Sequence, residues 1–437
     1  MKNKKYFYFL LITFFYFGSF SASKTRSFLK DNFECDFKLN YLASVQSQNY
    51  FDQEFNYTNA ILKKSDTEFK QELQPDLKLG LKMFPLKWRL KPKLKYKYGH
   101  YIIESKNQYF NISEYGFWEN YLSLELTSNF EFSVGIINIQ WGSSELLNPS
   151  QTLVSQQILN LEPFQYTQGI EMLNAQWTPS QNLTLNILKE LYPFDWDHSD
   201  ELVTIKRKFS EKLLIRGEYA SSSGALVLGQ VLATKKTDKD RFNYGAYGLL
   251  NYTDWTQIYF DFLIQKGSEV IYLDENMKLS PVYEDSDYLF SLGLIGHRLT
   301  FENGIEWKVE YIFNSFGKTT SERDFEANAL KKNPLDSIAL TAYYQRSYIL
   351  PGQSYIYNSL RWDEPKWLSS LFSSSTMYLR VLSSLADSSG FTQFEFQSSL
   401  SDSWTQGMAF AKSFGEEKKD LNSELDYLAV YSIKKTF

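Results

Sequence analysis

Six basic side chains alternate with apolar or aromatic side chains in the stretch 86–98, LKWRLKPKLKYKY. The basic positions are Lys87, Arg89, Lys91, Lys93, Lys95 and Lys97. A period of two is typical of a β-strand, because successive side chains of a strand point to opposite faces. One face of this strand would therefore be cationic along its whole length. Such a row attracts anions, and it would suit phosphate, sugar acids or acidic oligosaccharides.

The basic row needs neutralising charges. Neighbouring positions on one face of a strand lie about 6.7 Å apart, and unit charges at that distance repel by about 0.6 kcal/mol in bulk water. Anions from solution could neutralise the row, which predicts an anion track. Carboxylates on facing strands could do the same, which predicts a general pore. The candidate carboxylates are Glu119, Glu125, Glu131, Glu306, Glu310 and Glu395.

A strand with one apolar face and one charged face fits a membrane β-barrel, where lipid lies on one side and a watery lumen on the other. The preceding segment adds Lys78 and Lys82 to the expected lumen lining. Aromatic residues make up 17% of the 437 residues, and barrels use them as girdles at both lipid interfaces. The mean hydropathy of -0.38 excludes a bundle of transmembrane helices.

The first residues predict a secretory signal peptide. Basic residues at positions 2, 4 and 5 precede an apolar core at 6–17, and the small residues that follow permit cleavage after Ser21 or Ser23. We therefore expect residues 1–23 to be the signal peptide and residues 24–437 to form one exported barrel domain.

The alternating segments predict an all-β fold, a transmembrane antiparallel up-and-down barrel with long extracellular loops. We count nineteen segments, but single-chain bacterial barrels have an even number of strands. Eighteen is therefore expected, with 16 and 20 open, and the region 201–241 is the least certain. The segments are 33–46, 69–83, 86–98, 118–126, 130–141, 169–178, 183–191, 201–209, 213–221, 225–234, 242–252, 255–265, 287–298, 304–313, 353–362, 376–385, 390–400, 404–413 and 424–437. Pro92 predicts a bulge or an incompletely paired position in its strand, because proline lacks a ladder donor.

Two segments are too long to be simple turns. Residues 142–168 are expected to fold into the lumen and narrow it, although an ordinary surface loop fits the sequence equally well. Residues 314–352 are expected to form a long extracellular loop with a helix near 335–344.

The chain ends in an alternating aromatic strand. Counting back in twos from Phe437 reaches Ile433, Tyr431 and Tyr427. This pattern resembles the C-terminal signature of bacterial outer-membrane proteins, although Lys435 stands where a hydrophobic residue is usual. The resemblance implies that the barrel-insertion machinery reads this strand and that the protein resides in the outer membrane of a Gram-negative bacterium.

A second, narrower resemblance covers residues 135–151, GIINIQWGSSELLNPSQ. Trp141, Gly142, Asn148 and Pro149 match the "WG … NP" segment of some porin-like families. Those families usually have an acidic residue shortly after the proline, where this chain has serine and glutamine. The resemblance implies a porin-like channel, and we expect the four matching residues to belong to a constriction loop.

Residues for other chemistry are scarce. The three histidines, His100, His198 and His297, lack the H-x-S pairing of outer-membrane phospholipases, and no His/Cys cluster has zinc spacing. His198 with Asp200 leaves a rim protease open, and acids at 195, 197 and 200 could hold calcium weakly, but an exposed polar loop explains both. The net charge of -5 does not favour nucleic acid. We expect no enzymatic activity, no metal site and no cofactor.

The sequence therefore predicts an outer-membrane channel for passive diffusion of small hydrophilic solutes, with a preference for anions or acidic sugars as a finer expectation. The alternative is a non-conducting structural or adhesive barrel whose lumen is blocked by the 142–168 and 314–352 loops. The expected partners are outer-membrane lipid, the barrel-insertion machinery and the solutes. The sequence is compatible with an oligomer and does not identify one.

Overall fold

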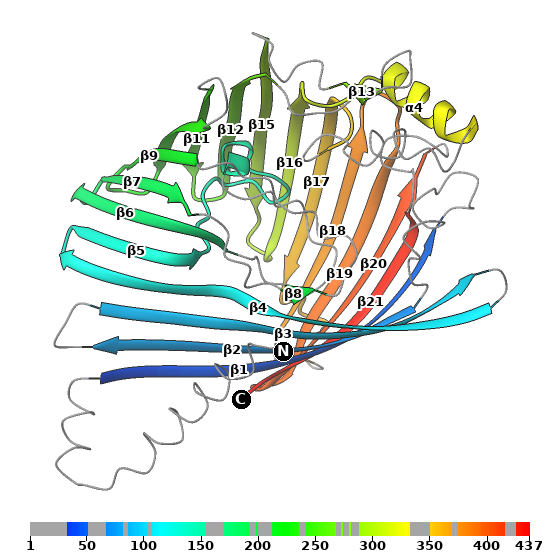
Figure 1. Ribbon diagram of the computed structural model, residues 1–437, viewed down its shortest axis with the longest axis horizontal. Helices are drawn as coiled ribbons and strands as arrows, with labels where there is room; N and C mark the ends of the chain where they lie inside the picture. Colours follow the sequence, from blue (N-terminus) through cyan, green and yellow to red (C-terminus); the bar gives the residue numbers. More distant parts are fainter. Residues whose placement is uncertain are drawn as a thin grey trace, which may run out of the picture.

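A computed structural model shows one closed barrel (Figure 1). The structure describes residues 33–50, 67–81, 86–103, 106–153, 169–191, 198–199, 212–235, 241–267, 272–273, 279–280, 288–332, 350–368, 372, 374–415 and 425–437. The expected signal peptide and the segment 154–168 lie outside these residues.

Eighteen antiparallel strands form the barrel wall. The first nine in the chain are β1 (Phe33–Tyr50), β2 (Thr67–Leu81), β3 (Leu86–Ile103), β4 (Lys106–Thr127), β5 (Phe130–Ile137), β6 (Ile170–Ser180), β7 (Leu183–Glu190), β9 (Lys212–Ala220) and β10 (Leu226–Lys235). The other nine are β11 (Arg241–Thr253), β12 (Thr256–Lys266), β15 (Leu289–Thr300), β16 (Ile305–Asn314), β17 (Ser354–Asp363), β18 (Ser374–Ser384), β19 (Gly390–Ser401), β20 (Trp404–Phe414) and β21 (Leu425–Thr436). Pairing of β1 with β21 closes the barrel.

The expected strand at 201–209 has no place in this wall. That segment lies outside the described residues, but β7 pairs directly with β9 from Leu183↔Tyr219 to Lys189↔Leu213. No strand can lie between two strands that share a hydrogen-bonded ladder. The count of eighteen is therefore confirmed, and the nineteenth segment was wrong as a wall strand.

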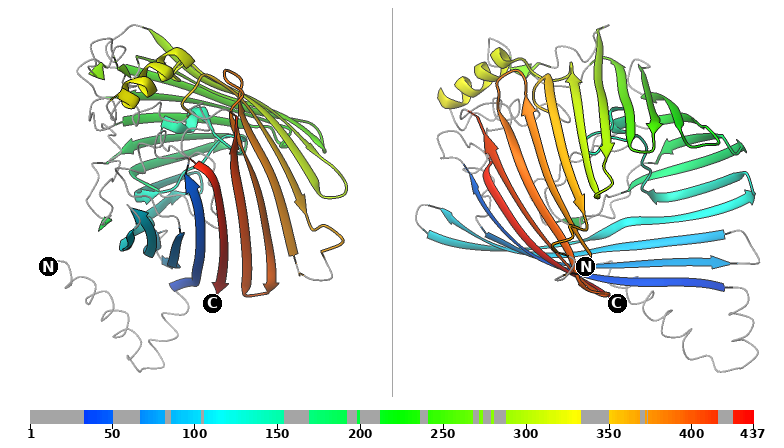
Figure 2. Two further views of the ribbon diagram at one scale, coloured as in Figure 1. Left: turned by 90° about the vertical axis from the view of Figure 1, so that its right-hand side faces the viewer. Right: turned by 180° about the vertical axis from the view of Figure 1, so that it is seen from behind.

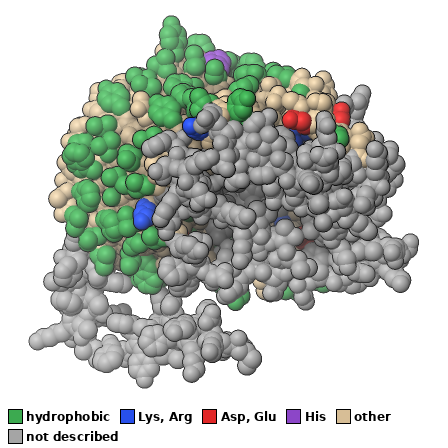
Figure 3. All heavy atoms as spheres, turned by 45° about the horizontal axis from the view of Figure 1, so that its top comes forward, with side chains coloured by type: hydrophobic (Ala, Val, Ile, Leu, Met, Phe, Trp, Pro, Cys, Tyr) green, Lys and Arg blue, Asp and Glu red, His purple; other side chains and the backbone are tan. Residues whose placement is uncertain are grey.

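The polarity of the wall is inverted relative to a soluble protein. On β12, Phe260 points outward and is 37% exposed, whereas its neighbour Asp261 points inward and is 1% exposed. The same alternation places Glu310 of β16 inside and Tyr311 outside. In Figure 3, hydrophobic side chains are spread over the coloured part of the outer surface. An apolar exterior around a polar interior is the pattern expected for a barrel surrounded by lipid.

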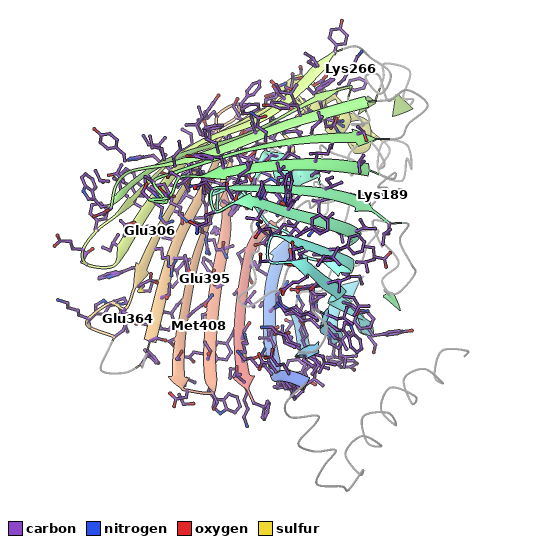
Figure 4. The ribbon with its side chains drawn as sticks, turned by 90° about the vertical axis from the view of Figure 1, so that its left-hand side faces the viewer. Lys189, Lys266, Glu306, Glu364, Glu395 and Met408 are labelled. Atoms are coloured by element: carbon purple, nitrogen blue, oxygen red, sulfur yellow. The ribbon has the colours of Figure 1, made fainter. Side chains whose placement is uncertain are left out.

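The two ends of the barrel differ. Short turns join β4 to β5, β6 to β7, β11 to β12 and β19 to β20, whereas the long connections lie at the opposite end. Figure 4 shows Lys189 and Lys266 at the long-loop end and Glu364 at the short-turn end. Exposed aromatic side chains gather on the strand ends and turns of the short-turn end, as in a membrane-interface girdle. They are Trp177, Tyr252, Trp255, Phe301, Trp307, Trp367, Trp404 and Phe437.

Strands β3 and β4 are longer than the alternation predicted. They contain 18 and 22 residues, whereas about 9–11 residues suffice to cross a membrane. The β3–β4 register shifts between Lys91 and Pro92, and the extra residue there, Trp118, lies on β4. The pairing is thus irregular at Pro92, as expected, but the bulge lies on the neighbouring strand.

Few described elements lie outside the wall. β8 (His198–Ser199) pairs with β4, and β13 (Tyr272–Leu273) pairs with β14 (Leu279–Ser280). In the loop after β16, the helix α4 (Thr320–Lys332) begins with a capping box, in which Thr319 and Glu322 hydrogen-bond each other. A helix was expected near 335–344, which lies outside the described residues, and α4 was not predicted. No helix in the described parts of the chain is long and apolar enough to cross a membrane.

Candidate functional site

The segment 138–153 enters the barrel and lies against its inner wall. It contains the 3-10 helix η1 (Pro149–Leu153), which contacts β11, β12 and β15. Figures 1 and 2 show this segment enclosed by the strands. Trp141, Leu146 and Leu147 are buried within a hydrophobic cluster that includes inward-facing residues such as Met172 of β6 and Leu188 of β7. Apolar packing therefore fixes one side of the segment to the wall.

A buried carboxylate of the wall binds the beginning of η1. Asp261 accepts hydrogen bonds from the backbone N–H of Ser150 (2.7 Å) and from its hydroxyl (3.1 Å). Ser150 can approach β11 closely because Gly245 stands there; a Cβ on Gly245 would lie 2.7 Å from that of Ser150.

The four residues of the "WG … NP" match belong to this segment. The indole N–H of Trp141 donates to the Ser150 hydroxyl (2.8 Å), which links the start of the segment to Asp261. Gly142 has a φ of 86°, and an added Cβ would overlap the Asn148 side chain. The Asn148 amide oxygen accepts from the backbone N–H of Ser144 (3.0 Å), and Pro149 begins η1. These contacts make the segment a compact turn.

A second buried carboxylate, Glu310 of β16, holds the middle of the segment. It accepts hydrogen bonds from the hydroxyl of Ser144 (2.9 Å), the backbone N–H of Glu145 (3.2 Å) and the hydroxyl of Tyr259 (2.7 Å). Gly296 lies between Tyr259 and Glu310 in the strand register. A side chain on Gly296 would overlap the Tyr259 ring, so the glycine allows the tyrosine to reach across to Glu310.

The side chain of Glu145 lies between two cations of the barrel wall, on β16 and β18. Its carboxylate contacts the Lys308 ammonium (3.2 Å) and the Arg380 Nε (2.7 Å). Burial alone would raise the pKa of Glu145, but Lys308 and Arg380 outweigh it and hold this pKa below its usual value. Arg380 also pairs with Glu395 of β19 (2.5 Å), and Lys308 pairs with Glu306 (3.0 Å). The segment thus spans from β12 to β18.

An arginine of β9 contacts the start of the same segment. The Arg216 guanidinium lies over the Trp141 ring, 5.4 Å from its centroid, and donates to the Tyr247 hydroxyl (2.8 Å). It also pairs with Glu218, which accepts from the same Tyr247 hydroxyl. Tyr247 lies across Gly229, as Tyr259 lies across Gly296. Together these contacts hold the segment along the wall from β9 to β18.

Carboxylates meet the basic row of β3. Lys87 pairs with Glu125. Arg89 and Lys91 both pair with Glu119, at 3.2 and 2.8 Å, and both approach Asp76. Two of the candidate carboxylates therefore pair with three of the six basic side chains of β3, together with an aspartate of β2 that the sequence did not single out.

The other basic residues predicted to line the lumen have fewer described contacts with carboxylates. Lys78 lies 3.9 Å from Asp36 and is half exposed. Lys95 stands in register with Glu72 and Glu114. Lys82 and the side chains of Lys93 and Lys97 lie outside the described residues. The other candidate carboxylates have different partners. Glu131 accepts a hydrogen bond from Ser133, and Glu310 binds the inserted segment. Glu306 pairs with Lys308, and Glu395 pairs with Arg380.

The C-terminal strand closes the wall. Tyr431 and Phe437 are exposed on the outer face, and Tyr427 and Ile433 are partly exposed. The Lys435 ammonium lies 5.0 Å from the centre of the Trp404 ring and 4.4 Å from that of Phe437. Lys435 thus covers aromatic rings at the position where a hydrophobic residue is usual.

Neither a protein-family profile nor a curated protein matches the sequence. Solved structures do match. A BenF-like porin from Pseudomonas fluorescens Pf-5 has a TM-score of 0.52 at 11% identity, over 93% of this chain and 99% of that one. Acinetobacter baumannii OccAB1 has a TM-score of 0.52 at 9% identity, over 93% and 97%. Pseudomonas aeruginosa OpdL has a TM-score of 0.50 at 10% identity, over 92% and 99%. The chain has a porin fold.

Of the predicted constriction loop 142–168, the structure describes residues 142–153, which lie inside the barrel. The inward fold was expected from the length of this segment, but its anchors on β9, β12, β16 and β18 were not expected. Asp261 could have been noticed, because it is the one acid in the apolar run 258–264, IYFDFLI. Lys308 and Arg380 carry no such signal, because they alternate with apolar residues as on any lumen-facing strand.

Proposed function

We propose that this protein is an outer-membrane channel for passive diffusion of small hydrophilic solutes in a Gram-negative bacterium. The observation that carries the proposal is a closed eighteen-stranded wall, apolar outside and polar inside, with a segment held against its inner face by Asp261 and Glu310. A segment fixed in this way narrows the lumen and leaves the closed ring of strands intact. In this proposal Trp141, Gly142, Asn148 and Pro149 shape the constriction.

The preference for anions or acidic sugars is a separate part of the proposal. Its original support, the basic row on β3, is weakened because Lys87, Arg89 and Lys91 each meet a carboxylate. Paired charges largely cancel at a distance in a watery lumen. Lys308 and Arg380 on the opposite wall are also paired, with Glu145, Glu306 and Glu395. They support the preference only in a state in which the Glu145 side chain has left them.

The proposal includes the route to the membrane. The outward apolar face contacts outer-membrane lipid, and the strand ending at Phe437 is the expected signal for the barrel-insertion machinery. Heat-modifiable migration of the protein in outer-membrane fractions, lost when Phe437 is deleted, tests this part. The oligomeric state stays open.

A second candidate is a structural barrel with a blocked lumen. It is favoured by the buried apolar side chains Trp141, Leu146 and Leu147, which fill space inside the wall. Planar bilayers separate the two candidates. The channel proposal predicts stable conductance for the full protein. The blocked barrel predicts negligible conductance that appears only when residues 142–168 are deleted.

A further inference from the structure

Two cations on the inner wall converge on one carboxylate of the inserted segment. Lys308 of β16 and Arg380 of β18 are both in register with Ser359 of β17. Strands that are two apart lie about 9–10 Å from each other, and Ser359 is small, buried and uncharged. The space above Ser359 is therefore flanked by positive charges, and the Glu145 carboxylate lies there, 3.2 Å from the Lys308 Nζ and 2.7 Å from the Arg380 Nε.

The two cations are held in place without Glu145. Arg380 donates from Nη1 to Glu395 (2.5 Å), and its guanidinium stacks on Tyr378, 4.2 Å from the ring centre. Lys308 lies 3.0 Å from Glu306. A carboxylate site between the cations would therefore persist if the Glu145 side chain moved away, because each cation keeps a partner on the wall.

The inserted segment is also held without the Glu145 side chain. Glu310 binds the Ser144 hydroxyl and the backbone N–H of Glu145, and Asp261 binds Ser150. Rotation of the Glu145 side chain alone would thus remove its carboxylate from between the two cations while the segment stays in place. The side chains of Glu145, Lys308 and Arg380 retain 17%, 13% and 10% of their exposure, so water reaches them.

We propose that Lys308 and Arg380 form a subsite for the carboxylate of a small solute, and that Glu145 is its exchangeable resident. A solute carboxylate enters by displacing Glu145, and Glu145 returns when the solute leaves. The resident keeps the affinity of the subsite low, which favours release of the solute and hence passage. Only this last consequence rests on the proposed channel function; the subsite itself does not require conduction.

Binding of glucuronate to the full chain in detergent micelles, followed by NMR titration at fixed ionic strength, tests the proposal. Glucose serves as the uncharged probe of similar size. Without its resident, the Glu145→Ala variant should bind glucuronate at least about fivefold more tightly than the wild type, within the usual range of coupling between competing groups. Glucose affinity should not change. Adding Lys308→Gln to the same variant should remove the gain.

Glu125→Ala is the matched control, because it removes a carboxylate paired with Lys87 on β3 and changes the net charge equally. It should leave glucuronate affinity unchanged. The proposal is overturned if Glu145→Ala gives no gain, or if Glu125→Ala gives the same gain. If Glu145→Ala does not fold, the double variant Lys308→Gln/Arg380→Gln with the native loop must lose the weak wild-type binding, and retention of that binding overturns the proposal.

The bilayer experiment gives an independent result. A barrel that conducts no ions but shows the predicted gain refutes the channel and retains the subsite. A conducting barrel without the gain does the reverse.

Discussion

The backbone N–H and the hydroxyl of Ser150 donate to the two oxygens of one buried carboxylate, Asp261, at 2.7 and 3.1 Å. The two residues lie 111 positions apart in the chain, so this contact joins the inserted segment to the wall. Ser150 is the second residue of η1, so its backbone N–H has no acceptor within this short helix. The Asp261 carboxylate supplies that acceptor.

Replacing Asp261 with alanine should loosen the inserted segment. The change leaves the Ser150 N–H and hydroxyl without their buried acceptor, at a cost of about 1–3 kcal/mol. We expect faster limited proteolysis within 138–153 in detergent and noisier channel currents. Asp363→Ala is the control, since Asp363 pairs with Arg361 and Thr376 (both 3.0 Å) at the short-turn end. Equal protease resistance of the Asp261→Ala and Asp363→Ala variants would contradict this assignment.

Gly296→Ala should destabilise the barrel where Tyr259 crosses β15. The added methyl would push the ring away and break the hydrogen bond to Glu310. Overpacking of this kind costs about 1–3 kcal/mol, measurable by guanidinium unfolding. Gly293→Ala on the same strand is the control, because its Cβ would lie 3.9 Å from that of Phe262. The explanation is wrong if the two alanines have the same effect.

The stabilising contribution of Glu145 should depend on pH. Lys308 and Arg380 lower its folded-state pKa in spite of burial and of the neighbouring acid Glu310. A lowered pKa means that the contribution is complete above the unfolded value of about 4.3 and is lost as the pH falls toward the lower folded value. The stability difference between the wild type and Glu145→Gln should therefore be constant from about pH 8 to 5 and shrink below about pH 4. A difference that already fades near neutral pH would rule out this origin.

The ion pairs of β3 can be tested through ion selectivity. Lys91→Gln leaves Glu119 and Asp76 under-compensated, so the reversal potential in a KCl gradient should shift toward cations. Glu119→Gln should shift it toward anions. The double variant should return close to the wild type, because it removes a neutral pair. If the double variant keeps the shift of either single variant, the two charges do not cancel in the lumen.

Sequence reasoning predicted most of the wall because lipid imposes a strict period of two. Strands such as β12, where Phe260 and Asp261 alternate across the wall, follow this rule. It failed at 201–209, where the sequence alternates but the direct pairing of β7 with β9 leaves no room for a strand. It also underestimated the lengths of β3 and β4, whose distal ends lack a clear apolar face in the sequence. The helix α4 was missed because its sequence, TSERDFEANALKK, is mostly polar and carries no apolar stripe.

The inserted segment shows the limit of a one-dimensional pattern. The position of Trp141 and Pro149 could be expected from a local resemblance, but the contacts of Ser150 with Asp261 and of Glu145 with Arg380 join residues 111 and 235 positions apart. Such pairs depend on the register of the closed barrel. For the same reason, the sequence could not decide whether carboxylates or anions from solution neutralise the basic residues of β3.

Conductance of the purified full chain in planar lipid bilayers tests the central claim most directly. The account predicts stable, ohmic open-channel currents that increase when residues 142–168 are deleted, because the inserted segment narrows an otherwise continuous lumen. Absence of current from the full chain, folded as a heat-modifiable barrel, would contradict it, whether or not the deletion variant conducts.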